Sequence, residues 1–386
     1  MPSFDATIVG AGIAGLSLAR DLSARGLRVL LIDRKADLTA SVHTTGIFVR
    51  RTLEDFALPD RLLGPPIRNV VLYSPALRPL TLNSDHDEFR VGRMGLLYAE
   101  LLSACVRNGV RFSPSSRFLN SEESGQGSNV RIEFRGKLQS HSTTILVGAD
   151  GSRSQVASDL GLSENREWIV GAEEVLEGVS LEGPAAMHCF LDPVIAPGYI
   201  AWIVQDGEET HLGVGGYGER FHVLEALRKF RVRIAHLFDL SKATVRERRG
   251  GRIPVGGLLP RISNERGLLV GDAAGAVSPL TAGGFDGSLR LTRFAAEVIA
   301  TAAAAKRGDV LTSYSGEHFR TRFISRRWMR RAISVFDSPL LLEGACTMLR
   351  VPPFSALARH IFFGRGSFPE PAAEVLRALA DVRATS

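Results

Sequence analysis

The stretch from Gly267 to Arg290, GLLVGDAAGAVSPLTAGGFDGSLR, places one acid, Asp272, and many small residues between an apolar strand and a helix. A plain turn needs only one or two glycines, because glycine is required only where the backbone turns tightly or is approached closely. We therefore expect the small side chains of this segment to leave space for a large ligand that lies against the backbone.

A second glycine-rich stretch fits the G-x-G-x-x-G pattern. Gly10, Gly12 and Gly15 follow a short apolar strand and open a helix. In this pattern the first glycine permits a tight turn, the second lets backbone N–H groups approach a pyrophosphate, and the third lets helix and strand pack closely. The first helical residues, Ile13 and Ala14, belong to the positive N-terminus that faces the phosphates.

An acid closes the next strand of the same unit. Asp33 follows the strand LRVLLI, 23 positions after Gly10, where it is placed to accept hydrogen bonds from an adenosine ribose; Arg34 is placed to cover the adenine. Strand, turn, helix, strand and acid occur in order within about 30 residues, as the complete βαβ fingerprint requires. The chain is predicted to bind a dinucleotide, either FAD or NAD(P).

Three further stretches decide between these cofactors. Arg93 stands just before a predicted helix, Asp150-Gly151 ends an apolar strand, and Gly271-Asp272 lies in the opening stretch. With the N-terminal motif, this order resembles the FAD-binding domain of flavoprotein monooxygenases of the p-hydroxybenzoate hydroxylase type and of the geranylgeranyl reductase family. The resemblance implies non-covalent FAD, with Arg93 contacting it, Asp150 and Gly151 beside its pyrophosphate, and Asp272 accepting from its ribityl chain.

The residues after Asp272 resemble the reductases more than the hydroxylases. Hydroxylases of this fold usually continue with Ala-His, whereas this chain has Ala274-Gly275 and then SPLTAGG, in which Ala282 replaces one glycine of the reductase pattern. The resemblance implies that the following helix points its positive end at the flavin and stabilises its anionic reduced form. The further FAD-binding residues that it implies are Pro279, Gly283, Gly284 and Phe285.

The loop after the second strand departs from the reductase pattern. That family often has a Cys-Gly-Gly-Gly-like loop near the flavin, whereas SVHTTGIF retains Gly46 as a flavin-contacting residue and has no cysteine. His43, which can donate protons at neutral pH, and Thr44 are candidate catalytic substitutes. A loop histidine is, however, more often solvated or structural.

A middle segment, APGYIAWIVQDGEETHLGVGGY, is predicted to form two strands around a turn at Gly207. It resembles a reductase-family sheet that covers the flavin. Tyr199 and Trp202 are three positions apart, so they would face opposite sides of an ideal strand. Trp202 is a third catalytic or substrate-wall candidate, and an ordinary core role is the equal alternative.

The predicted fold class is α/β: a Rossmann-like FAD-binding domain of the p-hydroxybenzoate hydroxylase type, an inserted, mostly antiparallel β substrate domain and a C-terminal helical tail. The FAD-binding domain is expected to be discontinuous, over residues 1–70, 92–160 and 255–307. The substrate domain would comprise 71–91 and 161–254, and the helical region 308–386.

Composition narrows the class of protein. The 386 residues are 45% hydrophobic and 23% charged, with a net charge of +6, as in ordinary globular proteins. Cys105, Cys189 and Cys346 are far apart, which argues for a reducing cytoplasm and against a zinc or iron–sulfur site, so no metal is expected. Neither a signal peptide nor an apolar run of membrane-spanning length is evident, so a cytoplasmic location is expected.

The favoured function is a flavin-dependent reductase or dehydrogenase acting on carbon–carbon bonds of an apolar, isoprenoid- or polyketide-like small molecule. NAD(P)H or another reductant would donate the electrons, and no nucleic-acid partner is expected. The alternative is an NAD(P)H- and O₂-dependent monooxygenase. A flavin halogenase ranks below both, because YIAWIV lacks the Trp-x-Trp-x-Ile-Pro strand of halogenases, and a non-enzymatic role is left open.

The tail from Phe319 to Phe363 alternates arginine clusters with large apolar residues. Spacings of one to five residues are compatible with an apolar helix face made of Phe323, Ile324, Trp328, Ala332, Ile333 and Phe336. The favoured interpretation is a helix packed on the FAD-binding domain. The alternative is the outer wall of an apolar tunnel, whose arginines attract a phosphorylated or membrane-borne substrate.

Overall fold

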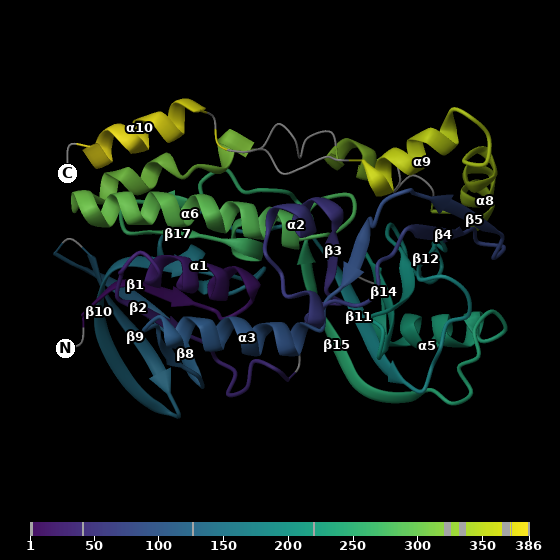
Figure 1. Cartoon of the computed structure of the whole chain (residues 1–386), viewed down its shortest axis with the longest axis horizontal. Helices are drawn as coiled ribbons and strands as arrows, with labels where there is room; N and C mark the ends of the chain where they lie inside the picture. Colours follow the sequence, from purple (N-terminus) through teal and green to yellow (C-terminus); the bar gives the residue numbers. More distant parts are fainter. Residues whose placement is uncertain are drawn as a thin grey trace.

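The computed structural model describes residues 3–40, 42–125, 127–218, 221–319, 326–331, 337–364, 371 and 373–384. Its strands form two large sheets side by side, with helices over both and along one edge of the molecule (Figure 1). Two short strands, β3 (Ile47–Val49) and β6 (Phe89–Val91), pair separately. The expected α/β class with a helical C-terminal region is confirmed.

The first sheet has eight strands. Across it run β16 (Ser263–Asn264), β17 (Gly267–Leu269), β10 (Lys137–Gly148), β1 (Ser3–Val9), β2 (Val29–Ile32) and β7 (Arg111–Ser113). The first half of β10 also pairs with β9 (Gly127–Phe134), and β9 pairs with β8 (Ser116–Ser124). Strands β17, β10, β1, β2 and β7 are parallel neighbours, so their carboxyl ends meet at one edge, where open α/β sheets bind ligands.

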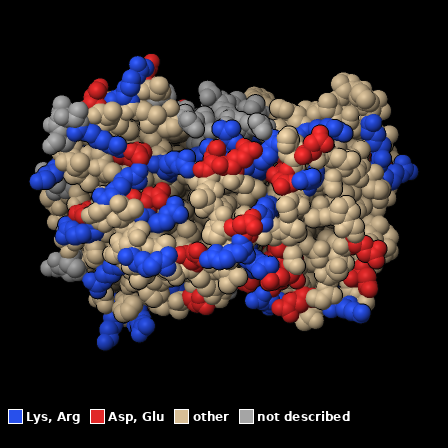
Figure 2. Space-filling model, in the orientation of Figure 1, with Lys and Arg blue, Asp and Glu red and all other residues tan. Residues whose placement is uncertain are grey.

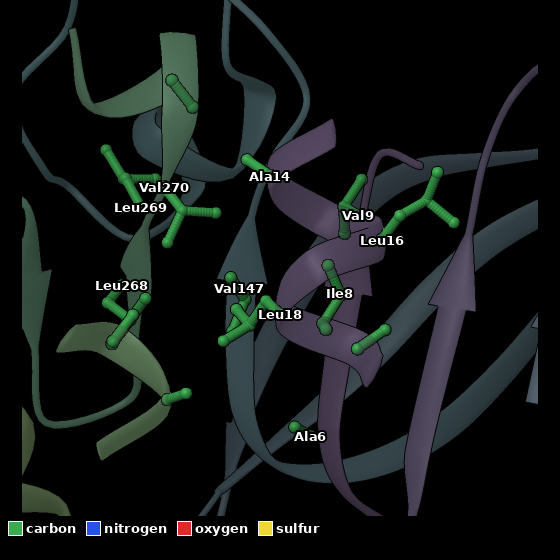
Figure 3. Close-up of a cluster of buried hydrophobic side chains, with 14 of the residues drawn as sticks. Ala6, Ile8, Val9, Ala14, Leu16, Leu18, Val147, Leu268, Leu269 and Val270 are labelled. Carbon is green, nitrogen blue, oxygen red and sulfur yellow. The ribbon is translucent and has the colours of Figure 1, made fainter. Parts of the chain in front are cut away.

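Helices α1 (Ile13–Ser23), α3 (Met94–Arg107) and α6 (Phe285–Ala305) pack together over this sheet. Figure 3 shows apolar side chains of β1, α1, β10 and β17 in one cluster, including Ile8, Leu16 and Val147, which are fully buried. Burying a side chain of this size contributes roughly 1.5–3 kcal/mol. This cluster therefore fixes α1, and with it the glycine-rich turn, on the sheet.

The second sheet has seven strands and is antiparallel except for one pair, β12 with β4. Across it run β15 (Thr244–Pro254), β11 (Trp168–Glu177), β14 (Thr210–Gly216), β13 (Ala201–Gln205), β12 (Ala186–Phe190), β4 (Asn69–Tyr73) and β5 (Pro79–Asn83). Helix α5 (Val223–Ile234) buries Leu227 and Phe230 against one face of this sheet. Strand β6, which lies within the segment 71–91 that was assigned to the substrate domain, pairs with β3 and is not part of this sheet.

The remaining elements are short or C-terminal. The short ones are α2 (Arg50–Asp55), α4 (Gln155–Asp159), η1 (Asp60–Leu62), η2 (Gly271–Ala274), η3 (Gly308–Ser313) and η4 (Gly316–Phe319). Helices α8 (Pro339–Met348) and α9 (Phe354–Phe363) lie beside β4 and β5, whereas α10 (Ala373–Ala384) packs on α6 (Figure 1). Within the tail, residues 326–331 are helical, and the remaining members of its predicted apolar face fall outside the described residues.

The surface carries charged groups of both signs (Figure 2). Basic and acidic side chains are interspersed on the face shown in Figure 2, so the net charge of +6 is not gathered into one patch there. Of the helices that the structure describes, none combines the length and the apolar character that a membrane crossing requires.

Candidate active site

A cavity of about 1380 Å³ runs from the carboxyl edge of the first sheet to the face of the second. Most of the residues selected from the sequence line it: Gly10, Gly12, Ile13, Ala14, Asp33, Arg34, His43, Thr44, Gly46, Asp150, Gly151, Trp202, Gly271, Asp272, Gly283, Gly284 and Phe285. Gly15, Arg93 and Pro279 are not among its lining residues.

The three glycines of the N-terminal motif have different surroundings. Gly10 has a φ of +102°, and a Cβ there would lie 2.3 Å from the carbonyl oxygen of Ala149. A Cβ on Gly15 would lie 1.9 Å from the carbonyl oxygen of Gly10, so this glycine permits packing of α1 on β1 and does not face the cavity. A Cβ on Gly12 would meet no atom within 4 Å. The space beside the N-terminus of α1 is thus open, as an anion site requires.

Asp33 is held in place at the end of β2. Its carboxylate accepts hydrogen bonds from the backbone N–H groups of Ala11, at 2.7 Å, and Lys35, at 2.8 Å. These two bonds tie the acid to the glycine-rich turn and present it to the cavity.

Asp272 follows β17 at the same edge and has a different environment. Burial raises the pKa of its carboxyl group to about 6. Among the residues that the structure describes, none donates a hydrogen bond to this side chain. Its Oδ1 atom would lie 3.5 Å from a Cβ placed on Gly284, so the acid adjoins the second glycine cluster. An acceptor that lacks a protein donor and faces a cavity fits a ligand that brings hydroxyl groups.

Asp150 binds its own chain. Its carboxylate accepts hydrogen bonds from the Ser154 hydroxyl, at 2.6 Å, and from the backbone N–H groups of Gln155 and Val156, at 2.8 and 3.2 Å. The side chain therefore holds the start of α4. Gly151, with a φ of +85° and no atom within 4 Å of its Cβ position, leaves the adjoining backbone accessible.

Arg93 and Pro279 are engaged elsewhere. Arg93 occupies the N-cap position of α3 without a side-chain capping hydrogen bond, and its guanidinium pairs with Glu208 of the β13–β14 turn at 2.7 Å. The Pro279 carbonyl accepts a hydrogen bond from Arg330, whose guanidinium also lies 4.2 Å from the ring centroid of Tyr217. Arg330 thereby fastens the helical segment 326–331 to the loop that precedes α6.

The wall opposite the glycine motifs is a row of residues across the second sheet. Arg249 on β15, Glu173 on β11, Gly213 on β14 and Trp202 on β13 stand directly opposite one another in successive strands. A Cβ on Gly213 would lie 2.2 Å from the indole of Trp202, so the ring lies over this glycine. The Trp202 indole N–H reaches across Gly213 to Glu173 Oε2, at 3.3 Å.

The expectation that Tyr199 and Trp202 face opposite sides of a strand was wrong. Strand β13 begins only at Ala201, so Tyr199 belongs to the preceding turn and does not follow the strand's alternation. A Cβ on Gly215 would lie 2.7 Å from the Tyr199 ring. Since Gly213 and Gly215 are two residues apart on β14, both aromatic rings cover the same face.

Glu173 is the residue that sequence reasoning missed. It is 4% exposed, yet it lines the cavity. Its carboxylate accepts hydrogen bonds from Thr45, Trp202 and the ring Nδ1 of His211, the last at 3.0 Å, and Arg249 lies 3.6 Å away. The signal in the sequence was an acidic pair inside the otherwise apolar strand WIVGAEEVLE, where a buried acid requires partners.

The loop candidates differ from one another. The Thr44 hydroxyl accepts from the Gly46 N–H, at 3.3 Å, and the Thr44 carbonyl accepts from Arg249, at 3.1 Å, so this residue serves the loop. Thr45 is the threonine that contacts Glu173.

His43 lies at the edge of the cavity, where partial burial and the charges of Lys35 and Arg34 lower its pKa. Its imidazole is therefore neutral at pH 7.

The far end of the cavity is apolar. Helices α8 and α9 and the neighbouring strands supply Leu72, Phe89, Met187, Leu342, Ala345, Cys346, Leu349, Phe354, Leu357, Ile361 and Phe362. Cys346, like Cys105 and Cys189, is a free thiol. One continuous cavity thus joins an edge suited to a dinucleotide with a compartment suited to a hydrocarbon.

Comparison with known proteins agrees with this geometry. Residues 3–322 match the family model described as FAD binding domain. The chain is 27% identical over 364 residues to a digeranylgeranylglycerophospholipid reductase of Methanocaldococcus jannaschii, covering 93% of this chain and 90% of the relative. A geranylgeranyl bacteriochlorophyll reductase-like structure from Thermoplasma acidophilum superposes with a TM-score of 0.82 at 19% identity, covering 99% of this chain and all of that one.

A flavin-dependent brominase is similar at a TM-score of 0.71 and 14% identity over the full length of both chains, which shows a shared fold. The resemblance to the geranylgeranyl reductase family is confirmed by the reductase relatives. The chain belongs to the FAD binding domain family, and it is an FAD-dependent oxidoreductase.

Proposed function

We propose that this protein reduces carbon–carbon double bonds in a long isoprenoid chain. The observation that carries the proposal is the continuity of the cavity, from the open N-terminus of α1 to the apolar compartment under α8 and α9. The M. jannaschii relative is named for reduction of a geranylgeranyl lipid, which is a substrate of this apolar, elongated kind.

The residues at the carboxyl edge would hold FAD as follows. The open N-terminus of α1 at Gly12 would receive the pyrophosphate, and Asp33 would accept from the ribose of the adenosine. Asp272 would accept from a ribityl hydroxyl, which gives its carboxylate the donor that the protein does not provide. When bound, FAD supplies the hydride chemistry.

The other residues would bind and orient the substrate. The side chains of α8 and α9 remove hydrocarbon from water, which stabilises binding by about 25 cal/mol per Å² of apolar surface buried. Trp202, fixed over Gly213, forms the flat wall against which an alkene lies. Arg330 closes the cavity beside the glycine cluster by holding the Pro279 carbonyl.

We further propose that the helical hairpin of α8 and α9 contacts a membrane surface. Several large apolar side chains of this hairpin point outward: Leu340 is 83% exposed, Val351 56% and Leu341 55%. The inner residues of the same hairpin line the cavity, so an isoprenoid chain could pass from lipid into the site without crossing water. An exposed apolar cluster of this kind marks an interaction surface.

The test of the proposed activity is anaerobic mixing of dithionite-reduced, FAD-loaded protein with geranylgeranyl diphosphate. The expected result is oxidation of the flavin together with a product that is heavier by two hydrogens per double bond reduced. Rapid oxygen consumption stimulated by substrate, with a hydroxylated product, would instead support the monooxygenase.

A further inference from the structure

Three buried titratable groups form a hydrogen-bonded chain behind the cavity wall. His211 is 2% exposed, and its Nδ1 lies 3.0 Å from Glu173 Oε1 while its Nε2 lies 3.4 Å from Asp206 Oδ2. The other oxygen of Asp206 accepts from the backbone N–H groups of Glu208 and Glu209, at 2.9 and 2.7 Å, in the β13–β14 turn. Of the three groups, only Glu173 lines the cavity.

The charges around these three groups determine which of them is protonated. Burial alone would lower the pKa of His211, but the carboxylates of Glu173 and Asp206 outweigh it and raise this pKa to about 9. Burial would raise the pKa of Glu173, yet His211, Thr45 and Arg249 hold it below its usual range. The imidazole is therefore the protonated member at neutral pH.

Other charged groups face the two ends of the chain. At the cavity end, Arg249 lies between Glu173 and Glu247, its own ion-pair partner at 2.8 Å. At the turn, Arg93 contributes to a lowered pKa of Asp206 and is paired with Glu208. Both carboxylates thus remain ionised, and the imidazolium between them donates from Nδ1 to Glu173 and from Nε2 to Asp206.

A neighbouring acid shows why this arrangement differs from an ordinary buried ion pair. Glu174, the next residue on β11, is 7% exposed and pairs with Arg231 and Arg248, both at 3.0 Å. Guanidinium groups do not release protons in proteins, whereas an imidazolium can give up a proton and take it back near neutral pH. Glu174 points to the opposite face of the sheet and does not line the cavity.

We propose that Glu173 gives the substrate its proton, that the Nδ1–H of His211 supplies this proton to Glu173, and that Asp206 holds the imidazole in place by accepting from its Nε2–H. This inference rests on the proposed function. Of these three groups only Glu173 lines the cavity, so it is the catalytic residue, and His211 and Asp206 act through it.

Reduction of a double bond adds a hydride, supplied by reduced FAD as the two-electron reductant, to one carbon and a proton to the other. The His211 Nδ1 proton moves to Glu173 Oε1; the resulting O–H bond then breaks, its electron pair stays on oxygen, and a C–H bond forms. The ring is then neutral, with its remaining proton on Nε2 beside Asp206, and it regains the Nδ1 proton by way of Glu173 from water in the cavity before the next turnover. Because the transfer breaks an exchangeable N–H bond and then an exchangeable O–H bond, product formation is expected to slow in D₂O.

Three variants test the proposal. Glu173→Gln keeps the size of the side chain but cannot carry the proton, His211→Gln removes the imidazole, and Glu174→Gln is the matched control on the same strand. In single turnover with geranylgeranyl diphosphate, Glu173→Gln and His211→Gln are expected to slow product formation by roughly 10²–10⁴-fold, the usual contribution of general acid catalysis. Glu174→Gln is expected to stay within a few-fold of the unmodified protein, and Glu173→Asp to restore part of the rate.

A second measurement does not depend on substrate or FAD. NMR titration of ring-labelled histidine, with His211→Gln to assign the resonance, is expected to show His211 losing its proton near pH 9. In Glu173→Gln this titration should move toward the ordinary value of about 6.5. The unfolding temperature of each variant shows whether a loss of activity or a changed titration reflects misfolding.

The outcomes separate the two proposals. If the unmodified protein does not reduce the isoprenoid, the proposed function fails, and the titration still decides whether the proton is held as described. If it does reduce the isoprenoid but Glu173→Gln is as fast as Glu174→Gln, the relay is wrong. A histidine that titrates near 6.5 in the unmodified protein overturns the relay independently.

Discussion

The indole ring of Trp202 lies over Gly213, whose absent side chain leaves the space that the ring occupies: a Cβ there would be 2.2 Å from the Trp202 Cζ2 atom. The two residues stand directly opposite each other on β13 and β14. This contact lets the indole N–H reach Glu173 on the next strand, so a glycine in β14 sets the geometry of the cavity wall.

Gly213→Ala is therefore expected to displace the Trp202 ring and break its bond to Glu173. Overpacking of this kind costs roughly 1–3 kcal/mol of unfolding free energy. Thermal unfolding and tryptophan fluorescence would measure the two effects. Gly251→Ala, on β15, is the control, since a Cβ there meets no atom within 4 Å. Equal unfolding temperatures for the two variants would show that the ring does not depend on Gly213.

Substitutions at Gly12 and Gly15 should separate cofactor binding from folding. Gly12→Val fills open space at the cavity and is expected to keep the fold while abolishing FAD retention. Gly15→Val drives its side chain into the carbonyl oxygen of Gly10 and is expected to destabilise the apoprotein itself. Circular dichroism and FAD titration would measure both properties. A Gly12→Val protein that binds FAD as before would show that the pyrophosphate lies elsewhere.

Asp272→Asn should stabilise the apoprotein while it weakens FAD binding. Because burial raises the pKa of Asp272 to about 6, the native state holds this proton to higher pH than the unfolded chain does. The contribution of this proton to the free energy of unfolding is fully present below about pH 4 and is lost as the pH rises to about 6. At pH 7 the buried carboxylate therefore destabilises the native state by roughly 1–3 kcal/mol, and an asparagine, which carries no charge, does not. Removal of the charged acceptor should weaken FAD binding by roughly 1–3 kcal/mol, about 5–150-fold.

Calorimetric unfolding of the apoprotein between pH 4 and 8 and equilibrium FAD titration would check the Asp272 prediction. If the unmodified apoprotein and the Asp272→Asn variant unfold with the same pH dependence, burial does not raise the pKa of Asp272.

Charges on the α8–α9 hairpin should remove the proposed membrane contact. Leu340→Glu with Val351→Glu is expected to abolish flotation of the protein with lipid vesicles, because a charge must be desolvated where an apolar side chain inserts. Leu138→Glu, on β10, is the matched control, since Leu138 is 78% exposed and lies on the first sheet. If the unmodified protein fails to float with either anionic or neutral vesicles at low salt, the membrane contact is wrong.

The sequence predicted the carboxyl edge of the first sheet well, for a physical reason. Gly10, Asp33, Asp150 and Asp272 each follow the apolar carboxyl end of a strand, and parallel strands bring such residues together at one edge of the sheet. The spacing of the motifs was therefore enough to predict which residues meet at this edge of the sheet.

The opposite wall could not be predicted in the same way. Glu173, His211 and Arg249 meet only because β11, β14 and β15 pair in one register. No local sequence pattern predicts this pairing. Tyr199 shows the complementary error: alternation was applied to a residue that lies outside the strand. Arg93 was placed by resemblance alone, and its ion pair with Glu208 on a distant turn is a tertiary contact.

The measurement that tests the central claim most directly is a single anaerobic turnover. The FAD-loaded protein, reduced with dithionite, is mixed with geranylgeranyl diphosphate while flavin absorbance is followed and the product is weighed by mass spectrometry. The account predicts that flavin oxidation and the gain of two hydrogens per double bond reduced proceed at the same rate. A flavin that stays reduced while substrate is present and unchanged would contradict it.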